Sequence, residues 1–465
     1  MAARHRLVPI IVASPLFLQN LDTSVMATAL PSIAESLHVE ALHLNLAITS
    51  YLLSLAVFLP ISGWLAERFG ARRMFCWAIG LFSLGSALCG AATSLESLVV
   101  FRVLQGLGGA MMMPVGRLIL LRTVPAAHMV AAMVWYTVPP GIGRMVGPLF
   151  GGVTVTWTSW RWIFLINVPF GIIAIAMALL FIDDLHDQRP AAPFDIGGFV
   201  LLALGLVGLL GGLETFGKSL VAVWLSWTAV GAGALGLLGY HLRSRRRAAP
   251  LIDLGVLRYP TYFTSIVGGT PLRIAIGASP FLLPLLMQIG FGLSPLDSGL
   301  LTLASALGGL ATRGVVAMAI RKAGFRALLL GSTALTSVFY MSYALFKPDT
   351  PHLAMFCTMM LGGLINSMVM VALQTLGFSE IPKPLMSHAT TLSSMAQQLS
   401  VSTGVVLGAS LVAAAAWWRG GSAATTHLAA ADFSPAFIAV GCMTLISLVF
   451  FTRLKKDEGE EMRGR

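Results

Sequence analysis

The stretch GWLAERFGARR, residues 63–73, is a short charged connection between two long apolar segments. Gly63 and Gly70 permit a tight turn and a close approach of the backbone. Glu67 can cap a helix end or pair with a basic group, and the other charges belong outside an apolar core. We therefore expect two membrane-spanning helices joined by a tight turn here. The basic residues of the stretch are Arg68, Arg72 and Arg73.

The composition extends this expectation to the whole chain of 465 residues. Hydrophobic residues make up 57% and charged residues 11%, with a mean hydropathy of +0.84, whereas a soluble domain has about 45–50% apolar and about 25% charged residues. A soluble fold of this size could not cover its surface with so few charges. The net charge of +11 does not indicate nucleic-acid binding, because the basic residues lie in short connections between apolar runs.

The sequence carries no pattern typical of an enzyme or a metal site. It has no phosphate-binding loop of the Walker A type and no hydrolytic triad. The four cysteines lie far apart inside apolar segments, without CxxC or Cys/His spacing, and are interpreted as packing residues. We therefore expect no cofactor and no metal, and energy drawn from a gradient.

Fourteen segments are near the roughly 20 apolar residues that a membrane-spanning helix needs. The first is too long for a signal sequence and has no small-residue cleavage site, so it is predicted to be a membrane helix. The segments are 7–30, 44–66, 73–93, 97–121, 129–154, 161–182, 195–214, 220–241, 261–290, 296–319, 326–346, 352–377, 385–417 and 434–453.

The distribution of Lys and Arg predicts the orientation of these helices. Of the 30 basic residues, 21 fall in the connections on the side of the N-terminus, 4 on the opposite side and 5 inside the segments. Because basic connections stay in the cytoplasm, both termini are predicted to be cytoplasmic, in the inner membrane of a bacterium. The same bias favours an even number of helices.

Several stretches resemble the signatures of one transporter group. Residues 63–73 resemble the major facilitator signature, with Glu67 where the family usually has Asp. Four more stretches, in order and on the matching helices, are similar to motifs of its fourteen-helix drug:proton antiporters, and PVGR in the fourth helix is similar to the enterobacterial multidrug-type members. These stretches are LDTSVMATALP (21–31), RVLQGLGG (102–109), PVGR (114–117), GRMVGPLFGG (143–152) and WRWIFLINVP (160–169).

This resemblance implies an all-α membrane protein with the major facilitator fold. Two pseudo-symmetric six-helix bundles are expected, with two extra helices between them. A fainter copy of the first stretch, RKAGFR at residues 321–326, fits the internal duplication of the superfamily. The expected domains are residues 1–190, an accessory helix pair at 191–247, and residues 248–465 with a cytoplasmic tail.

The resemblance also implies proton-coupled efflux of small amphipathic compounds. The expected partners are the substrate, protons and the lipid bilayer, and we expect a monomer. In the family, the stretch 63–73 is a conformational gate and the fifth-helix motif is tied to the direction of antiport. Small residues at this spacing also allow simple close packing and a kink. Members of the motif here are Gly143, Gly147, Pro148, Gly151 and Gly152.

Asp22 is the only acid well inside a segment of the N-terminal half. It lies roughly 22 Å from the inner end of its helix, and Arg102 lies roughly 8 Å from the outer end of the fourth helix. In an apolar core about 30 Å thick these depths coincide, so an ion pair is allowed. We interpret Asp22 as the proton carrier, with its protonation balanced between burial and Arg102. The alternative is a permanent ion pair that fixes helix packing.

Two further arginines lie deep inside predicted segments. Arg144, within the fifth-helix motif, is expected to contact substrate or to pair with an unidentified acid. Arg273 lies between Pro271 and Pro280, and no acid occurs deep inside the predicted segments of the C-terminal half, where Asp297 stands at the start of one segment. It is therefore expected to pair with Asp22 or to meet an anionic substrate.

Polar and adaptable side chains inside the segments are candidates for substrate contacts, and the 22 methionines suit a wall that accepts many shapes. Two other functions stay open. The buried arginines favour export of an anionic metabolite or metal chelate, and a membrane sensor or scaffold without transport is an alternative of another class. The candidate cleft residues are Gln19, Gln105, Met113, Tyr136, Arg144, Arg273, Gln288, Asn366 and Gln397.

Overall fold

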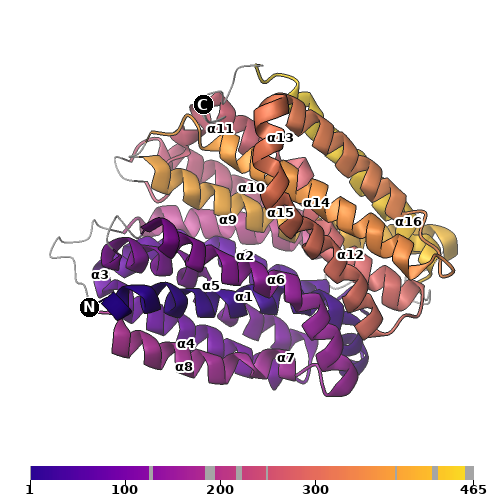
Figure 1. Ribbon diagram of the computed structural model, residues 1–465, viewed down its shortest axis with the longest axis horizontal. Coiled ribbons are helices and arrows are strands. Elements are labelled where there is room, and N and C mark those ends of the chain that lie inside the picture. Colours follow the sequence, from indigo (N-terminus) through magenta and orange to yellow (C-terminus); the bar gives the residue numbers. More distant parts are fainter. Residues whose placement is uncertain are drawn as a thin grey trace. The chain divides into compact units, whose positions relative to one another are not determined.

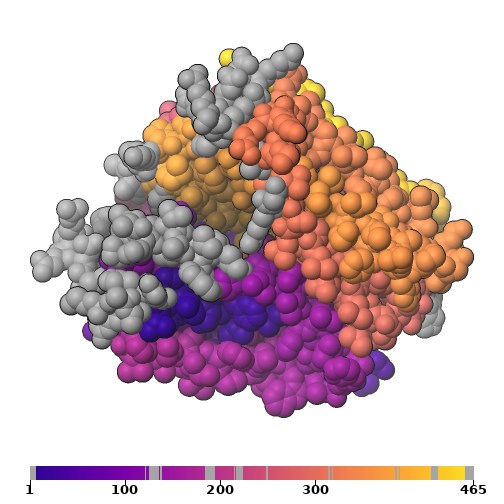
Figure 2. Space-filling model, viewed as in Figure 1, coloured from indigo at the N-terminus to yellow at the C-terminus, as the bar shows by residue number. Residues whose placement is uncertain are grey.

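The computed structural model describes residues 2–124, 129–183, 194–215, 223–247, 250–382, 385–420 and 428–455, and the other residues are grey in the space-filling view (Figure 2). Over the described residues the chain is almost entirely helical and has no β-strand. This confirms the predicted all-α class. The chain forms two compact units, Met1–Leu251 and Ile252–Arg465.

Helices of the first unit follow the predicted segments (Figure 1). The second predicted segment is divided, because Pro60 lies between the end of α2 and the start of α3. Ser94 begins α5 as an N-cap, its hydroxyl accepting a hydrogen bond from the Ser97 amide at 3.2 Å. The elements are α1 (Ala2–Leu37), α2 (Asn45–Phe58), α3 (Ile61–Phe69), α4 (Ala71–Gly90), α5 (Leu95–Thr123), α6 (Met129–Trp157), α7 (Trp162–Leu165), α8 (Asn167–Phe181), α9 (Ile196–Thr215) and α10 (Val223–Ser244).

The second unit contains two π-helical turns, η3 and η4, at either end of α12. Its core is built by apolar side chains of α12, α13, α14 and α16, among them Phe325, Leu373 and Phe451, which are all fully buried. The elements are η2 (Leu254–Arg258), α11 (Pro260–Phe263), η3 (Thr264–Gly268), α12 (Thr270–Leu285), η4 (Leu286–Gly290), α13 (Pro295–Tyr343), α14 (His352–Gly377), α15 (Met386–Gly420) and α16 (Ala430–Phe451).

Nine of the described helical stretches are long and apolar enough to cross a membrane. The predicted number of fourteen is not established by this criterion. Two predicted segments join in α13, which continues past a non-helical Gly324, and the segment divided at Pro60 leaves two shorter helices. Every predicted segment nevertheless coincides with one or more helices.

The two related stretches of sequence adopt the same turn. Gly70 has φ 89° and Gly324 has φ 77°, a backbone region that favours glycine. Two residues after each glycine, an arginine binds the carbonyl oxygen that ends the last helix of its own bundle. Arg72 Nη1 donates to the Ile182 oxygen at 3.1 Å, and Arg326 Nη2 donates to the Thr452 oxygen at 3.0 Å. The copy at 321–326 is therefore a structural repeat.

The accessory pair α9 and α10 belongs to the first unit. Asp195 precedes α9 and accepts two hydrogen bonds from Arg243 of α10, at 3.0 Å from Nε and 2.8 Å from Nη2. Arg243 holds the pKa of this carboxyl below its usual range. At the other end of the pair, the Thr215 and Ser226 hydroxyls lie 2.9 Å apart. The two helices are thus tied at both ends.

An aromatic cluster joins the accessory pair to the helix that carries the gate motif. The ring centroid of Phe194 lies 4.9 Å from that of Trp64 in α3, and Phe199 lies 5.9 Å from Phe58 in α2. The α9 helix therefore packs beside α2, and Phe194, which precedes α9, contacts α3. The predicted boundary at residue 190 separates elements that are in contact within one unit.

Candidate functional site

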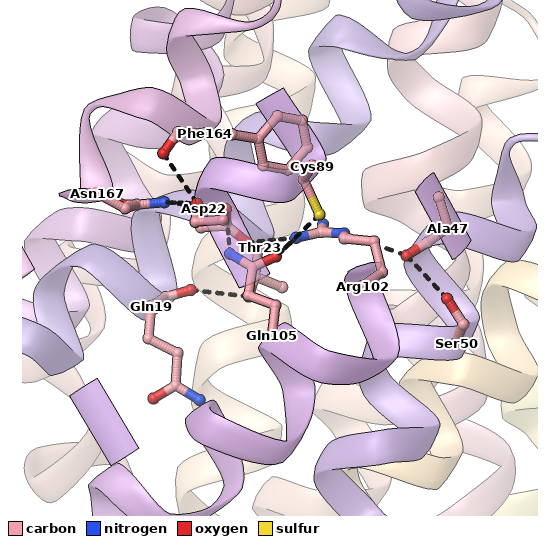
Figure 3. A network of polar contacts seen from close by, with 11 residues as sticks. Gln19, Asp22, Thr23, Ala47, Ser50, Cys89, Arg102, Gln105, Phe164 and Asn167 are labelled. Carbon is pink, nitrogen blue, oxygen red and sulfur yellow. Dashed lines mark hydrogen bonds and ion pairs between the residues drawn. The ribbon is translucent and has the colours of Figure 1, made fainter. Parts of the chain in front are cut away.

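Asp22 lies in the middle of α1 and is 2% exposed. Both oxygens of its carboxylate have partners from other helices. Oδ2 lies 2.6 Å from Arg102 Nη1, whereas Oδ1 accepts hydrogen bonds from Gln105 Nε2 at 3.0 Å and Asn167 Nδ2 at 3.3 Å. The predicted ion pair is present and links α1 to α5 (Figure 3).

Arg102 is 1% exposed, and its charge is shared among several groups. Besides Asp22, Nη1 donates to the Gln105 side-chain oxygen at 2.7 Å, and Nε donates to the Ala47 carbonyl at 3.3 Å. The guanidinium carbon lies 4.7 Å from the ring centroid of Tyr51 and 5.3 Å from that of Phe164. Aromatic faces attract a cation without neutralising it, so Asp22 remains the one acid paired with Arg102 within the described contacts.

Sequence reasoning did not assign Asn167 to the site. Asn167 begins α8, and its amide nitrogen bridges Asp22 to the Ser86 hydroxyl, which lies 2.8 Å away. Ser86 in turn donates to the Phe164 carbonyl at 2.9 Å. The signal was available, because Asn167 is the polar residue on the apolar side of Arg161 in the quoted WRWIFLINVP stretch. The network therefore joins α1, α4, α5 and α8.

Close packing of small residues builds this polar core. A Cβ added to Gly106 would lie 2.7 Å from the Ser54 side chain of α2, and one added to Gly85 would lie 2.6 Å from the Gln105 backbone. Gly106 of α5 and Gly85 of α4 thus let α5 approach its neighbours at the level of the ion pair. A side chain at either position would displace the helices that carry the network.

The glycines of the fifth-helix motif pack α6 against α1, as predicted. An added Cβ would lie 2.5 Å from the Phe17 carbonyl at Gly143, 2.5 Å from the Ser24 side chain at Gly147, and 3.0 Å from Val25 at Gly151. Of the other two members, Pro148 is half-buried and Gly152 is buried. The motif therefore sits on the helix that carries Asp22.

Arg144 has a polar partner on α1, and it is not an acid. Its Nη2 donates to the Asn20 side-chain oxygen at 2.6 Å, while the Arg144 carbonyl accepts from Ser24 at 2.8 Å. The Arg144 side chain is exposed. The sequence analysis expected a substrate or an acid as the partner of Arg144, and not an asparagine.

The other candidate residues of the first unit lie at different levels of α1, α5 and α6. Gln19 is buried and donates to the Gly109 carbonyl at 3.2 Å. Tyr136 is also buried, and its hydroxyl donates to the Met113 carbonyl at 2.7 Å. The Met113 side chain is 42% exposed. Of the predicted cleft residues in this unit, the polar network around Asp22 includes only Gln105 within the described contacts.

Arg273 is 3% exposed and is held by its own helical segment. Nη1 donates to the carbonyls of Ser265 at 2.6 Å and Ile266 at 3.4 Å, both in the π-turn η3. The sequence analysis expected Asp22 or a substrate anion as the partner, and did not foresee these carbonyls. The expectation that the C-terminal helices contain no acid is wrong, because α13 includes Asp297 in its first turn and α16 includes buried Asp432.

Asp432 does not pair with Arg273 in the described contacts. It accepts hydrogen bonds from Arg419 at 2.7 and 2.8 Å, near the ends of α15 and α16. The remaining candidates of this unit are half-buried. Gln288 lies 3.4 Å from the Ser298 hydroxyl, Asn366 donates to the Tyr340 hydroxyl at 3.1 Å, and Gln397 lies on α15.

The gate stretch differs in one respect from its predicted role. A Cβ added to Gly63 would meet nothing within 4 Å, so the close approach predicted there is not found among the described residues. Gly63 lies inside α3, and the turn is made by Gly70. Arg68 and Arg73 are exposed, and the side chain of Glu67 lies outside the described residues.

Residues 16–405 match the sequence model of the Major Facilitator Superfamily. The chain belongs to this superfamily. It is a multi-pass membrane transporter of the bacterial inner membrane and not an enzyme. Over 458 residues it is 37% identical to a protein of Salmonella heidelberg (strain SL476) that carries the provisional name multidrug resistance protein MdtD, covering 97% of this chain and 95% of that one. Its counterpart in Salmonella typhimurium gives the same figures.

Solved structures with this fold include an auto-inhibited peptide transporter of the POT family, with a TM-score of 0.70 and 16% identity over 97% of both chains. A D-xylose-proton symporter matches with a TM-score of 0.64 and 15% identity over 97% of this chain and 98% of that one. These likenesses confirm the predicted major facilitator fold.

Proposed function

We propose that the protein exports small amphipathic compounds in exchange for protons, with Asp22 as the proton carrier. The observation that carries this proposal is the buried network in which Asp22 is paired with Arg102. Ionisable groups inside a membrane are costly and are retained mostly where they serve transport. The multidrug names of the relatives support the substrate class.

Protonation of Asp22 would change the contacts that bind α1 to α5 and α8. The ionised carboxylate accepts hydrogen bonds from three side chains, those of Arg102, Gln105 and Asn167. A proton on either oxygen neutralises the acid and leaves the Arg102 charge without its counter-ion. The network then favours a different arrangement of helices. The protonated and ionised states thus make different contacts, as alternating access requires.

The packing of α6 against α1 places the fifth-helix motif next to the proton carrier. Ser24, two residues after Asp22, contacts Gly147 and donates to the Arg144 carbonyl. A shift of α1 on protonation would therefore be passed to α6. This packing supports a role for the motif in antiport. The proposal also places both termini in the cytoplasm and has the protein act as a monomer without a cofactor.

A second candidate is export of an anionic compound. It is favoured by Arg273, which is buried and has no acidic partner within the described contacts. An arginine is always charged, so it can be satisfied by a substrate anion as well as by backbone carbonyls. This candidate keeps Asp22 as the proton carrier and changes only the charge of the cargo.

The test uses the full-length protein in proteoliposomes, with a fluorescent lipophilic cation and a fluorescent organic anion as cargo. We expect an imposed pH gradient to drive flux in the wild type and not in Asp22→Asn. Substrate exchange without a gradient should survive in Asp22→Asn, which shows that the variant is folded. The matched control is Asp195→Asn, another buried acid paired with an arginine, which should keep gradient-driven flux. Undiminished gradient-driven flux in Asp22→Asn would overturn the proposal.

A further inference from the structure

A crevice of about 570 Å³ opens on the first unit beside the gate motif. One end is basic, with Arg68 from α3 and Arg73 from α4. The rest of the wall is apolar and is made by α3, α4 and α5. The apolar lining residues are Leu65, Phe69, Met74, Trp77, Leu81 and Met111.

The crevice runs lengthwise along α4. Arg73, Trp77 and Leu81 are spaced four residues apart, so they share one face of the helix. From Arg73 to Leu81 the helix rises about 12 Å, nearly half the thickness of an apolar bilayer core. Trp77 is 73% exposed, which places this face of α4 at the surface of the unit. The crevice therefore begins at the basic start of a membrane helix and descends toward the middle of the membrane.

The basic end is held in position by aromatic rings. The guanidinium carbon of Arg68 lies 5.4 Å from the ring centroid of Trp64 and 5.9 Å from that of Phe69. Such contacts orient a cation and leave its charge available to an anion. Arg73 also lines the crevice. Two guanidinium groups next to an apolar channel match a ligand with an anionic head and a hydrocarbon tail.

We propose that this crevice binds an anionic phospholipid. The phosphate lies at the basic end, between Arg68 and Arg73, and an acyl chain follows the apolar wall along Trp77. With the predicted cytoplasmic termini, the basic end faces the inner leaflet, which is rich in anionic lipid and favours basic pockets between helices. The site is separate from the Asp22 network and does not depend on proton coupling.

The lipid would act on the gate motif directly. Arg68 lies on α3 beside Trp64, whose ring contacts Phe194 of the accessory pair. A bound phosphate would fix Arg68 and so stabilise the contact between α3 and Phe194, which leads into α9. The anionic leaflet would thereby favour one arrangement of the gate.

The experiment measures thermal melting of the purified full-length protein in a neutral detergent, titrated with phosphatidylglycerol, phosphatidylcholine or inorganic phosphate. We expect phosphatidylglycerol to stabilise the wild type at a concentration at least about tenfold lower than phosphatidylcholine, because two basic side chains face its head group. Inorganic phosphate, which cannot use the apolar wall, should give no comparable shift. Equal shifts with both lipids, or with phosphate alone, would overturn the proposal.

Paired variants test the two ends of the crevice. Leu81→Trp fills the apolar wall and Arg68→Gln/Arg73→Gln removes the basic end, so each should lose the preference for phosphatidylglycerol. Leu84→Trp, at an exposed position of α4 outside the crevice, and Arg321→Gln/Lys322→Gln, in the related stretch of the second unit, should keep it. Retained preference in both crevice variants, or equal loss in Leu81→Trp and Leu84→Trp, counts against the site.

Discussion

The first long helix of each unit carries a buried charge, and the two charges are neutralised in different ways. Asp22 in α1 faces an arginine from another helix, with two amide side chains completing the contacts of its carboxylate. Arg273 in α12 faces carbonyl oxygens of the π-turn that precedes its own helix. One charge therefore depends on the packing of four helices, whereas the other is satisfied locally.

The two units share the turn in their gate-like stretches, but they do not share the buried charge. The turns at Gly70 and Gly324 and the arginines that follow them are alike in both units. The charged centres are unlike, since an aspartate can gain and lose a proton in the functional range and an arginine cannot. The repeat thus preserves the elements that close each bundle, whereas the proposed proton carrier lies in the first unit.

The largest expected effect is the loss of Arg102. Arg102→Leu leaves Asp22 buried without a counter-ion, and breaking a buried pair in this way costs about 3–5 kcal/mol. We expect a large fall in the melting temperature of the purified protein at neutral pH. Acidic buffer should recover part of the loss, because protonation removes the unpaired charge.

The double variant Asp22→Asn/Arg102→Gln is the control for this prediction. It removes both charges and retains polar side chains, so it should melt closer to the wild type than Arg102→Leu does. If the double variant is as unstable as the single one, the cost comes from lost packing of Arg102 and not from the stranded charge.

A smaller effect is expected for Arg273→Met. The substitution keeps most of the side-chain volume and leaves two carbonyls with fewer donors, which costs about 1–3 kcal/mol. Gradient-driven flux should remain sensitive to pH, because Asp22, the proposed proton carrier, is untouched. The measurement is melting temperature together with flux as a function of pH. Loss of the pH dependence would show that Arg273 shares in proton coupling.

The sequence predicted the helices, the membrane class and the Asp22–Arg102 pair because each follows from spacing. Apolar segments, basic connections and the rise per residue of a helix set the depth of a side chain without any knowledge of packing. The contact with Asn167 depends on how α8 crosses α1 and α4, which spacing along the chain does not determine. The roles of these residues in proton transfer stay predictions.

Arg273 and Asp432 show where spacing was insufficient. The π-turn that brings the Ser265 carbonyl to Arg273 changes the register of the helix. The sequence analysis found no residue pattern in the segment that predicts such a turn. The last predicted segment begins at residue 434 and so excludes Asp432. This residue lies in the first turn of α16, where it is buried and paired with Arg419.

The shared glycines should respond alike to substitution. Gly70→Ala and Gly324→Ala each place a side chain at positive φ, which costs on the order of 1–3 kcal/mol. We expect similar falls in melting temperature for the two variants. Gly63→Ala is the matched control, because Gly63 is helical and an added Cβ meets nothing there. A large effect at only one of the two turns would contradict their equivalence.

The smallest expected effect concerns the arginines after these turns. Arg72→Gln and Arg326→Gln each remove a cation from the carbonyl end of a helix, an interaction that contributes about 0.3–1 kcal/mol. Lysine at either position keeps the charge but offers no planar fork, so it should recover part of the loss. Hydrogen exchange at the last turns of α8 and α16 measures the effect locally. If the turns close both bundles in the same way, Arg72→Gln should speed exchange at α8 alone and Arg326→Gln at α16 alone. Exchange that rises at both helix ends in either variant would mean that these arginines act through the fold as a whole.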